Sequence, residues 1–134
     1  MPHLVVLYTA DLEREGQIAQ LCRRLADTMV AQRDESGRAV FPVGGVRVLA
    51  YPAAHHAVGD GQGELGFAYL NLRMARGRSP AVRQAVGEAL AQATRAHFAP
   101  LLATRHFGIT LQVDEGHEVF DAKLGNLHAL FGAR

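Results

Sequence analysis

Hydrophobic and polar positions divide the first half of the chain into a strand, a helix and a second strand. Residues 3–9 form an almost continuous apolar segment, which predicts a buried strand. From Ile18 to Val30, apolar residues recur at i, i+3, i+4 spacing, which predicts an amphipathic helix with Asp11 placed to cap it. A polar loop and a turn follow, and residues 46–51 then predict a second strand that ends at Pro52.

The second half repeats this order after a glycine-rich connector. Residues 67–74 alternate between apolar and polar, as expected for a strand with two different faces. Ser79 and Pro80 are typical of an N-cap followed by the first helical residue, and the helix they begin is expected to run to about Ala103. Residues 107–113 predict the fourth strand.

These elements predict an α/β (α+β) fold built from two tandem βαβ units. We expect one domain over 1–134, with halves at about 2–56 and about 64–115 and a C-terminal tail at 116–134. Strands within a βαβ unit are parallel, so the two units predict a four-stranded sheet with both helices on one face. The opposite face would remain apolar, which favours burial against other subunits.

Composition narrows the possible partners. The 14 Lys and Arg residues nearly balance 13 Asp and Glu residues, so no net field favours nucleic acid or an anionic membrane. No apolar run approaches the roughly 20 residues that a membrane span needs, and the start does not resemble a signal peptide. The single cysteine, Cys22, cannot close an intrachain disulfide. We therefore expect a cytoplasmic protein.

Several familiar site motifs are missing or incomplete. His55 and His56 are adjacent and lack the Cys, His, Asp or Glu partners of a metal site, so they are expected on the surface. The segment 59–63 is rich in glycine but lacks the Lys-Ser/Thr pair of a phosphate-binding loop. No Ser-His-Asp or Cys-His arrangement can be proposed. The sequence thus predicts neither a metal nor an organic cofactor.

Pro2, directly after the initiator, is the most informative candidate. A small residue after Met1 usually allows the methionine to be removed, which would leave Pro2 with a free secondary amine. An α-amino group titrates near about 7.7–8.0, close to the working range of a general base. An apolar pocket or nearby guanidinium groups would lower this pKa further.

Two arginines are candidates for binding an acidic substrate. Arg47 lies early on the second predicted strand between valines, so its head points either to water or into a polar pocket. Arg78 precedes a helix N-terminus, where free N–H groups favour anions. Arg73 and Arg76 add positive charge nearby, although such a cluster can also be a solvated loop.

Together these residues resemble the 5-carboxymethyl-2-hydroxymuconate isomerases of the tautomerase superfamily. The matching segments occur in order through most of the chain: Pro2-His3, Phe41-Pro42 with Gly45-Val46-Arg47, Gly77-Arg78-Ser79 with Arg83, His97-Phe98 with Leu101 and Arg105, and Asn126 to Phe131. The chain departs from the family at Leu7 and Tyr8, where members carry an acidic residue and a cysteine. These departures bear on the substrate more than on the chemistry.

The resemblance implies a homotrimeric, cofactor-independent isomerase of aromatic-compound catabolism. Pro2 falls on the catalytic base, while Arg47 and Arg78 fall on residues that bind substrate carboxylates. The implied reaction moves a proton along a conjugated enol of a small unsaturated di- or tricarboxylate.

Two alternatives stay open at this point. The same amine could activate water for dehalogenation or hydration of an unsaturated acid. A non-catalytic trimeric binding protein with a vestigial pocket would retain the fold without turnover.

Overall fold

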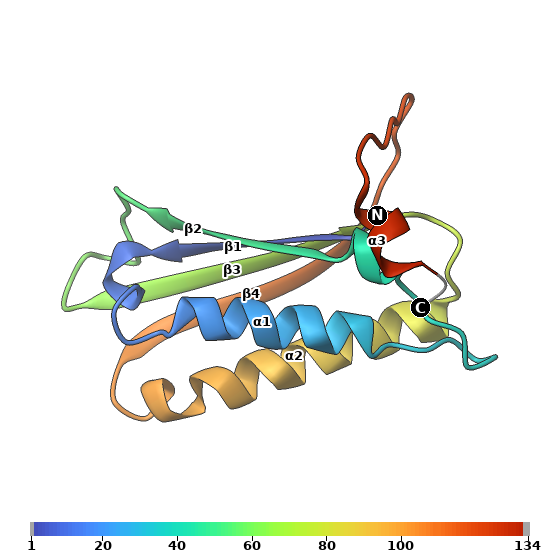
Figure 1. Ribbon diagram of the computed structural model, residues 1–134. Helices are drawn as coiled ribbons and strands as arrows, with labels where there is room; N and C mark the ends of the chain where they lie inside the picture. Colours follow the sequence, from blue (N-terminus) through green and yellow to red (C-terminus); the bar gives the residue numbers. More distant parts are fainter. Residues whose placement is uncertain (1, 133–134) are drawn as a thin grey trace.

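Two strand–helix–strand units join into one four-stranded sheet (Figure 1). A computed structural model describes residues 2–132. The strands are β1 (His3–Thr9), β2 (Arg47–Ala53), β3 (Leu65–Met74) and β4 (His106–Glu115), in the spatial order β2-β1-β3-β4. The pairs β1–β2 and β3–β4 are parallel, and β1 and β3 meet antiparallel in the middle. This topology confirms the two tandem βαβ units.

Both long helices cover the same face of the sheet, as expected. Helix α1 (Ile18–Val30) and helix α2 (Pro80–Leu102) lie side by side beneath it in Figure 1. Alternate residues of β1, namely Leu4, Val6 and Tyr8, are buried against them. Ser79 caps α2 by accepting a hydrogen bond from the Val82 amide, which confirms the predicted helix start. Within residues 2–132, no helix is long and apolar enough to cross a membrane.

The predicted role of Asp11 as the cap of α1 is wrong. Residues Ala10–Leu12 form a short 3-10 helix, η1, and α1 begins only at Ile18 without a side-chain cap. The Asp11 carboxylate instead accepts a hydrogen bond at 2.5 Å from Arg105, whose side chain is largely buried. A charge-assisted hydrogen bond of this kind is stronger than a hydrogen bond to a neutral backbone amide. The Asp11 carboxylate therefore pairs with Arg105.

The second strand also runs further than its sequence suggests. It continues through Pro52 to Ala53, and Pro52 lies opposite Tyr8 of β1. Strand β2 is at the edge of the sheet, where a proline that cannot donate a hydrogen bond is tolerated. Pro52 therefore does not end the strand.

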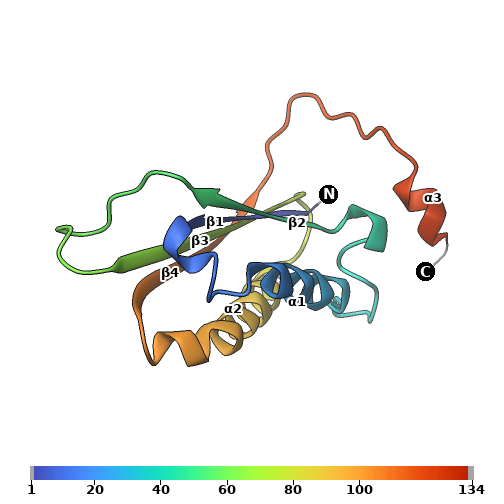
Figure 2. The ribbon, with the colours of Figure 1, turned by 60° about the vertical axis from the view of Figure 1, so that its left-hand side comes forward.

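The C-terminal tail, residues 116–132, leaves β4 as an arch and returns to the sheet's end (Figure 2). It finishes in the short helix α3 (Leu127–Phe131), which packs on a second 3-10 helix, η2 (Val43–Gly45). A Cβ atom at Gly44 would approach the His128 Cα to 3.1 Å, so this close packing requires glycine. The tail is thereby fixed just before the start of β2.

We predict that Gly44→Ala releases α3 while leaving the sheet intact. The added methyl group would be tighter against His128 than ordinary contacts allow, so one of the two segments must move. Hydrogen exchange of the 127–131 amides should then accelerate at least about tenfold, with little change in β1. Gly87→Ala is the matched control, because its Cβ would meet only Val113 at 3.8 Å. Unchanged exchange in Gly44→Ala would contradict this view of the tail.

Candidate active site

The sheet topology gathers the candidate residues at one end of the molecule. Strands β1 and β2 begin there, and β3 ends there because it runs antiparallel to β1. His3 is paired in register with Arg47 on one side and with Arg73 on the other. Pro2 immediately precedes this row of three residues. Pro2 and the guanidinium groups of Arg47 and Arg73 thus share one end of the sheet without being close in the sequence.

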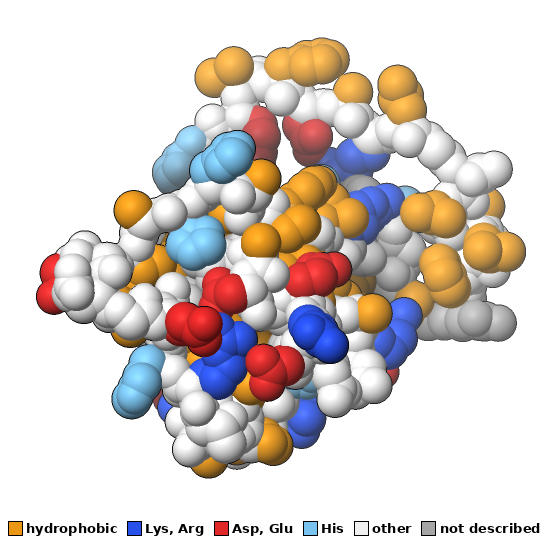
Figure 3. Space-filling view, turned by 90° about the vertical axis from the view of Figure 1, so that its left-hand side faces the viewer, with side chains coloured by type: hydrophobic (Ala, Val, Ile, Leu, Met, Phe, Trp, Pro, Cys, Tyr) orange, Lys and Arg blue, Asp and Glu red, His pale blue; other side chains and the backbone are white. Residues whose placement is uncertain are grey.

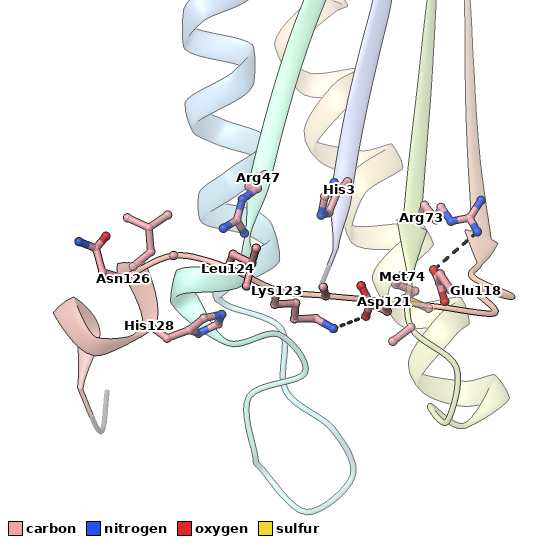
Figure 4. Close-up of a pocket in the computed structure, with 14 residues that line it drawn as sticks. His3, Arg47, Arg73, Met74, Glu118, Asp121, Lys123, Leu124, Asn126 and His128 are labelled. Carbon is pink, nitrogen blue, oxygen red and sulfur yellow. Dashed lines mark hydrogen bonds and ion pairs between the residues drawn. The ribbon is translucent and has the colours of Figure 1, made fainter.

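A cavity of about 490 Å³ lies between this end of the sheet and the tail. His3, Arg47, Arg73 and Met74 line it from the sheet. The remaining lining residues come from the segment after β3 and from the tail: Ala75, Glu118, Asp121, Ala122, Lys123, Leu124, Gly125, Asn126, Leu127 and His128. Figure 4 shows Arg47 and Arg73 on either side of His3, with the tail passing below the strand ends.

Arg47 carries the clearest signal of a ligand. Its Nη1 atom is buried, and no described residue accepts a hydrogen bond from it. Leaving a buried polar group without a partner costs about 1–3 kcal/mol, and more for a charged group. A guanidinium group placed in this way at a cavity is suited to bind an anion such as a carboxylate.

His3 lies beside Arg47, and the pKa of its imidazole is lowered, which favours the neutral form. Burial lowers the pKa of the His3 imidazole, and the positive charge of Arg47 lowers it further. Asp121 acts in the opposite direction, with a smaller effect. A neutral imidazole can both donate and accept a hydrogen bond, which suits a group that faces a bound acid.

Pro2 is buried at the start of β1 but does not line the cavity directly. Its neighbour His3 does, so the nitrogen of Pro2 lies one residue from the cavity wall. Met1, whose removal would expose that nitrogen, lies outside the described residues.

Arg78 lies at the same end of the molecule but has a different environment. Its guanidinium group donates hydrogen bonds to the backbone oxygens of Val40 at 2.8 Å and Ala75 at 2.9 Å. It also stacks over the Phe41 ring at 5.0 Å, and burial lowers its pKa. Arg78 is not among the residues that line the cavity. The structure therefore brings together Pro2, His3 and Arg47 and holds Arg78 on the Val40 and Ala75 backbones, outside the cavity lining.

Sequence reasoning missed the charged residues of the tail. Glu118 forms an ion pair with Arg73, and Asp121 forms one with Lys123. The signal was the alternation of charged and apolar residues between His117 and Leu124, which is unusual for a tail with no structural role. Among residues 2–132, no three His, Cys, Asp or Glu side chains come together as a metal site would require.

We predict that Arg47→Met stabilises the folded protein. The substitution removes a buried donor that has no partner, so the free energy of unfolding should rise by about 1 kcal/mol or more. Arg78→Met is the matched comparison, and it should destabilise the protein because two backbone carbonyls and the Phe41 ring lose their partner. Urea unfolding of both variants measures the difference. Equal destabilisation by the two substitutions would contradict the assignment of Arg47 as an unpartnered cation.

The same Arg47→Met variant should raise the pKa of His3. The positive charge of Arg47 disfavours the imidazolium form, and its removal leaves burial as the main cause of the shift. NMR titration of the His3 ring protons measures this change. Arg23→Met, on the exposed side of α1, is the control and should leave the His3 pKa unchanged. A fall in the pKa of His3 in Arg47→Met would show that the two side chains do not interact as described.

Comparison with known proteins identifies the family of the chain. The family model for 5-carboxymethyl-2-hydroxymuconate isomerase matches residues 2–131. A 5-carboxymethyl-2-hydroxymuconate Delta-isomerase of Escherichia coli is 28% identical over 131 residues, covering 98% of this chain and 99% of that protein.

Solved structures give the same result. The crystal structure of a 5-carboxymethyl-2-hydroxymuconate delta-isomerase is 56% identical with a TM-score of 0.95, covering 100% of this chain and 95% of that one. A 5-carboxymethyl-2-hydroxymuconate isomerase from Deinococcus radiodurans R1 is 32% identical with a TM-score of 0.86, covering 97% and 93%. On this basis the chain belongs to the 5-carboxymethyl-2-hydroxymuconate isomerase family.

Proposed function

We propose that this isomerase transfers a proton along the conjugated enol of a small unsaturated di- or tricarboxylate, similar to 5-carboxymethyl-2-hydroxymuconate. In this proposal the amine of Pro2 is the base, exposed once Met1 has been removed. Arg47 and Arg78 bind the substrate's carboxylates, and no cofactor takes part.

The observation that carries the proposal is the buried, unpartnered Nη1 of Arg47 at the cavity. A ligand that binds this group must offer hydrogen-bond acceptors, since a guanidinium group has only donors. Its positive charge favours an anion among such ligands. A carboxylate accepts two parallel hydrogen bonds from it, which fixes both the position and the orientation of the acid.

Pro2 is suited to both halves of a proton transfer. The base must take a proton from one site on the substrate and return it to another, so its pKa must lie near the working pH. Pro2 is buried, and Arg47 begins the strand beside it. Both burial and this positive charge disfavour a protonated amine, which keeps the base available.

The arginines also act on the transition state. Negative charge develops on the enol or carbonyl oxygen as the proton leaves carbon or oxygen, and a fixed guanidinium group nearby lowers that barrier. Arg47 is placed for this role. Arg78 uses two of its five N–H groups on backbone oxygens, so three remain for a substrate carboxylate.

We further propose that the protein is a homotrimer. The face of the sheet opposite the helices is open in Figure 1, and Leu7 (45% exposed) and Tyr51 (50% exposed) lie beside each other on it. Leu49 and Phe67 add to the same apolar surface. Figure 3 shows hydrophobic side chains on this surface and along the arch of the tail above it. Further copies of the chain would remove these side chains from water.

The test of the proposed base compares three forms of the protein in the enol-to-keto conversion of 2-hydroxymuconate and phenylenolpyruvate. Pro2→Ala should lose about 100-fold or more of kcat/KM, within the range that general base catalysis contributes. A form that carries a permanently attached extra residue in front of Pro2 should be inactive. In that form the Pro2 nitrogen is part of an amide bond, which is not basic.

Pro100→Ala, in the last turn of α2 and exposed, is the matched control and should retain full activity. Full activity in Pro2→Ala would mean that the proline amine is not the base.

A further inference from the structure

We propose that Arg73 binds a second substrate carboxylate and that Glu118 occupies this position when the site is empty. This inference rests on the proposed function and adds Arg73 to Arg47 and Arg78, as a further residue that distinguishes dicarboxylates from monocarboxylates at the cavity wall that Arg78 does not line. Glu118 belongs to the tail, so the tail would supply an internal competitor for the substrate.

The geometry follows from the register of three strands. Arg47 and Arg73 are both paired with His3, one on each side of it. Neighbouring strands lie about 4.8 Å apart, so the two arginine Cα atoms are about 10 Å from each other on the same face of the sheet. Both side chains line the same cavity, on opposite sides of His3 (Figure 4). This arrangement suits an acid with a carboxylate at each end.

The present partner of Arg73 is a weak one. Its Nη2 atom is 3.6 Å from a carboxylate oxygen of Glu118, and the side chains are 56% and 46% exposed. Exposed ion pairs of this kind contribute about 0–1 kcal/mol. A substrate held at its other end by Arg47 delivers its second carboxylate at high effective concentration, so it can displace Glu118.

The charges around the cavity fit this exchange. Arg47, Arg73 and Lys123 are cationic, whereas Glu118 and Asp121 are anionic. Glu118 is paired with Arg73 and Asp121 with Lys123, while Arg47 Nη1 has no partner among the described residues. One carboxylate therefore binds at Arg47 without displacing anything, and a second one binds by replacing a carboxylate of the tail.

The experiment measures the binding of two matched acids by titration calorimetry. trans,trans-Muconate and sorbate share the same six-carbon diene, but sorbate has a methyl group in place of one carboxylate. Arg73→Gln should weaken muconate binding about fivefold to tenfold, the range expected for hydrogen bonds to a half-exposed charged group, and should leave sorbate binding unchanged. Glu118→Gln should tighten muconate binding up to about fivefold, because the competitor loses its charge.

The double variant tests the connection between the two residues. In an Arg73→Gln background, Glu118→Gln should no longer tighten muconate binding, since its effect acts through Arg73. Arg23→Gln, which breaks an exposed ion pair on α1, is the control and should change neither affinity. Unchanged muconate binding in Arg73→Gln, weaker binding in Glu118→Gln, or equal effects on both acids would overturn the proposal.

This outcome is separable from that of the proposed function, because calorimetry requires no turnover. If neither enol substrate reacts but the binding differences appear, the proposed reaction is wrong and the role of Arg73 stands. If both substrates react through Pro2 and Arg73→Gln changes neither the affinity for muconate nor the KM for 2-hydroxymuconate, the role of Arg73 is wrong.

Discussion

The register of β1 with its two neighbours determines where the strand residues of the candidate site lie. Because β1 pairs with β2 on one edge and β3 on the other, His3 comes between Arg47 and Arg73. A shift of one residue along either neighbour would turn the arginine of that strand to the helix side of the sheet. The core prevents such a shift, since Leu4 and Val6 of β1 are fully buried on the helix side of the sheet. Hydrophobic alternation thus fixes the positions of the charges.

This constraint explains why much of the fold could be predicted from sequence. Apolar periodicity is a property of each element, and it identified the four strands and both long helices. The local pair Ser79-Pro80 identified the cap of α2. Predictions failed where one contact over a long sequence separation outweighed a local preference. Asp11 was expected to cap α1, but Arg105 takes its carboxylate from 94 residues away. Pro52 does not end β2, because β2 is an edge strand. A proline there does not need the backbone N–H donor that it lacks.

The site was predictable only in part, for the same reason. Pro2, Arg47 and Arg78 were proposed from their local settings and from the family resemblance, and all three lie at one end of the molecule. The sequence could not predict the hydrogen bonds from Arg78 to the backbone oxygens of Val40 and Ala75, because those segments meet only in the fold. The position of the tail was even harder to predict from the sequence. Its position depends on the close packing of α3 against Gly44, which no periodicity records.

The proposed function requires a free Pro2 amine whose neutral form is favoured. Titration of the Pro2 nitrogen by ¹⁵N NMR, in protein from which Met1 has been removed, tests this most directly. Burial of Pro2 and the positive charge of Arg47 should lower the amine's pKa below about 7.7, the lower end of the ordinary range for α-amino groups. A pKa of about 8 or higher would contradict the account, because the amine would then be mostly protonated and unable to act as a base at neutral pH.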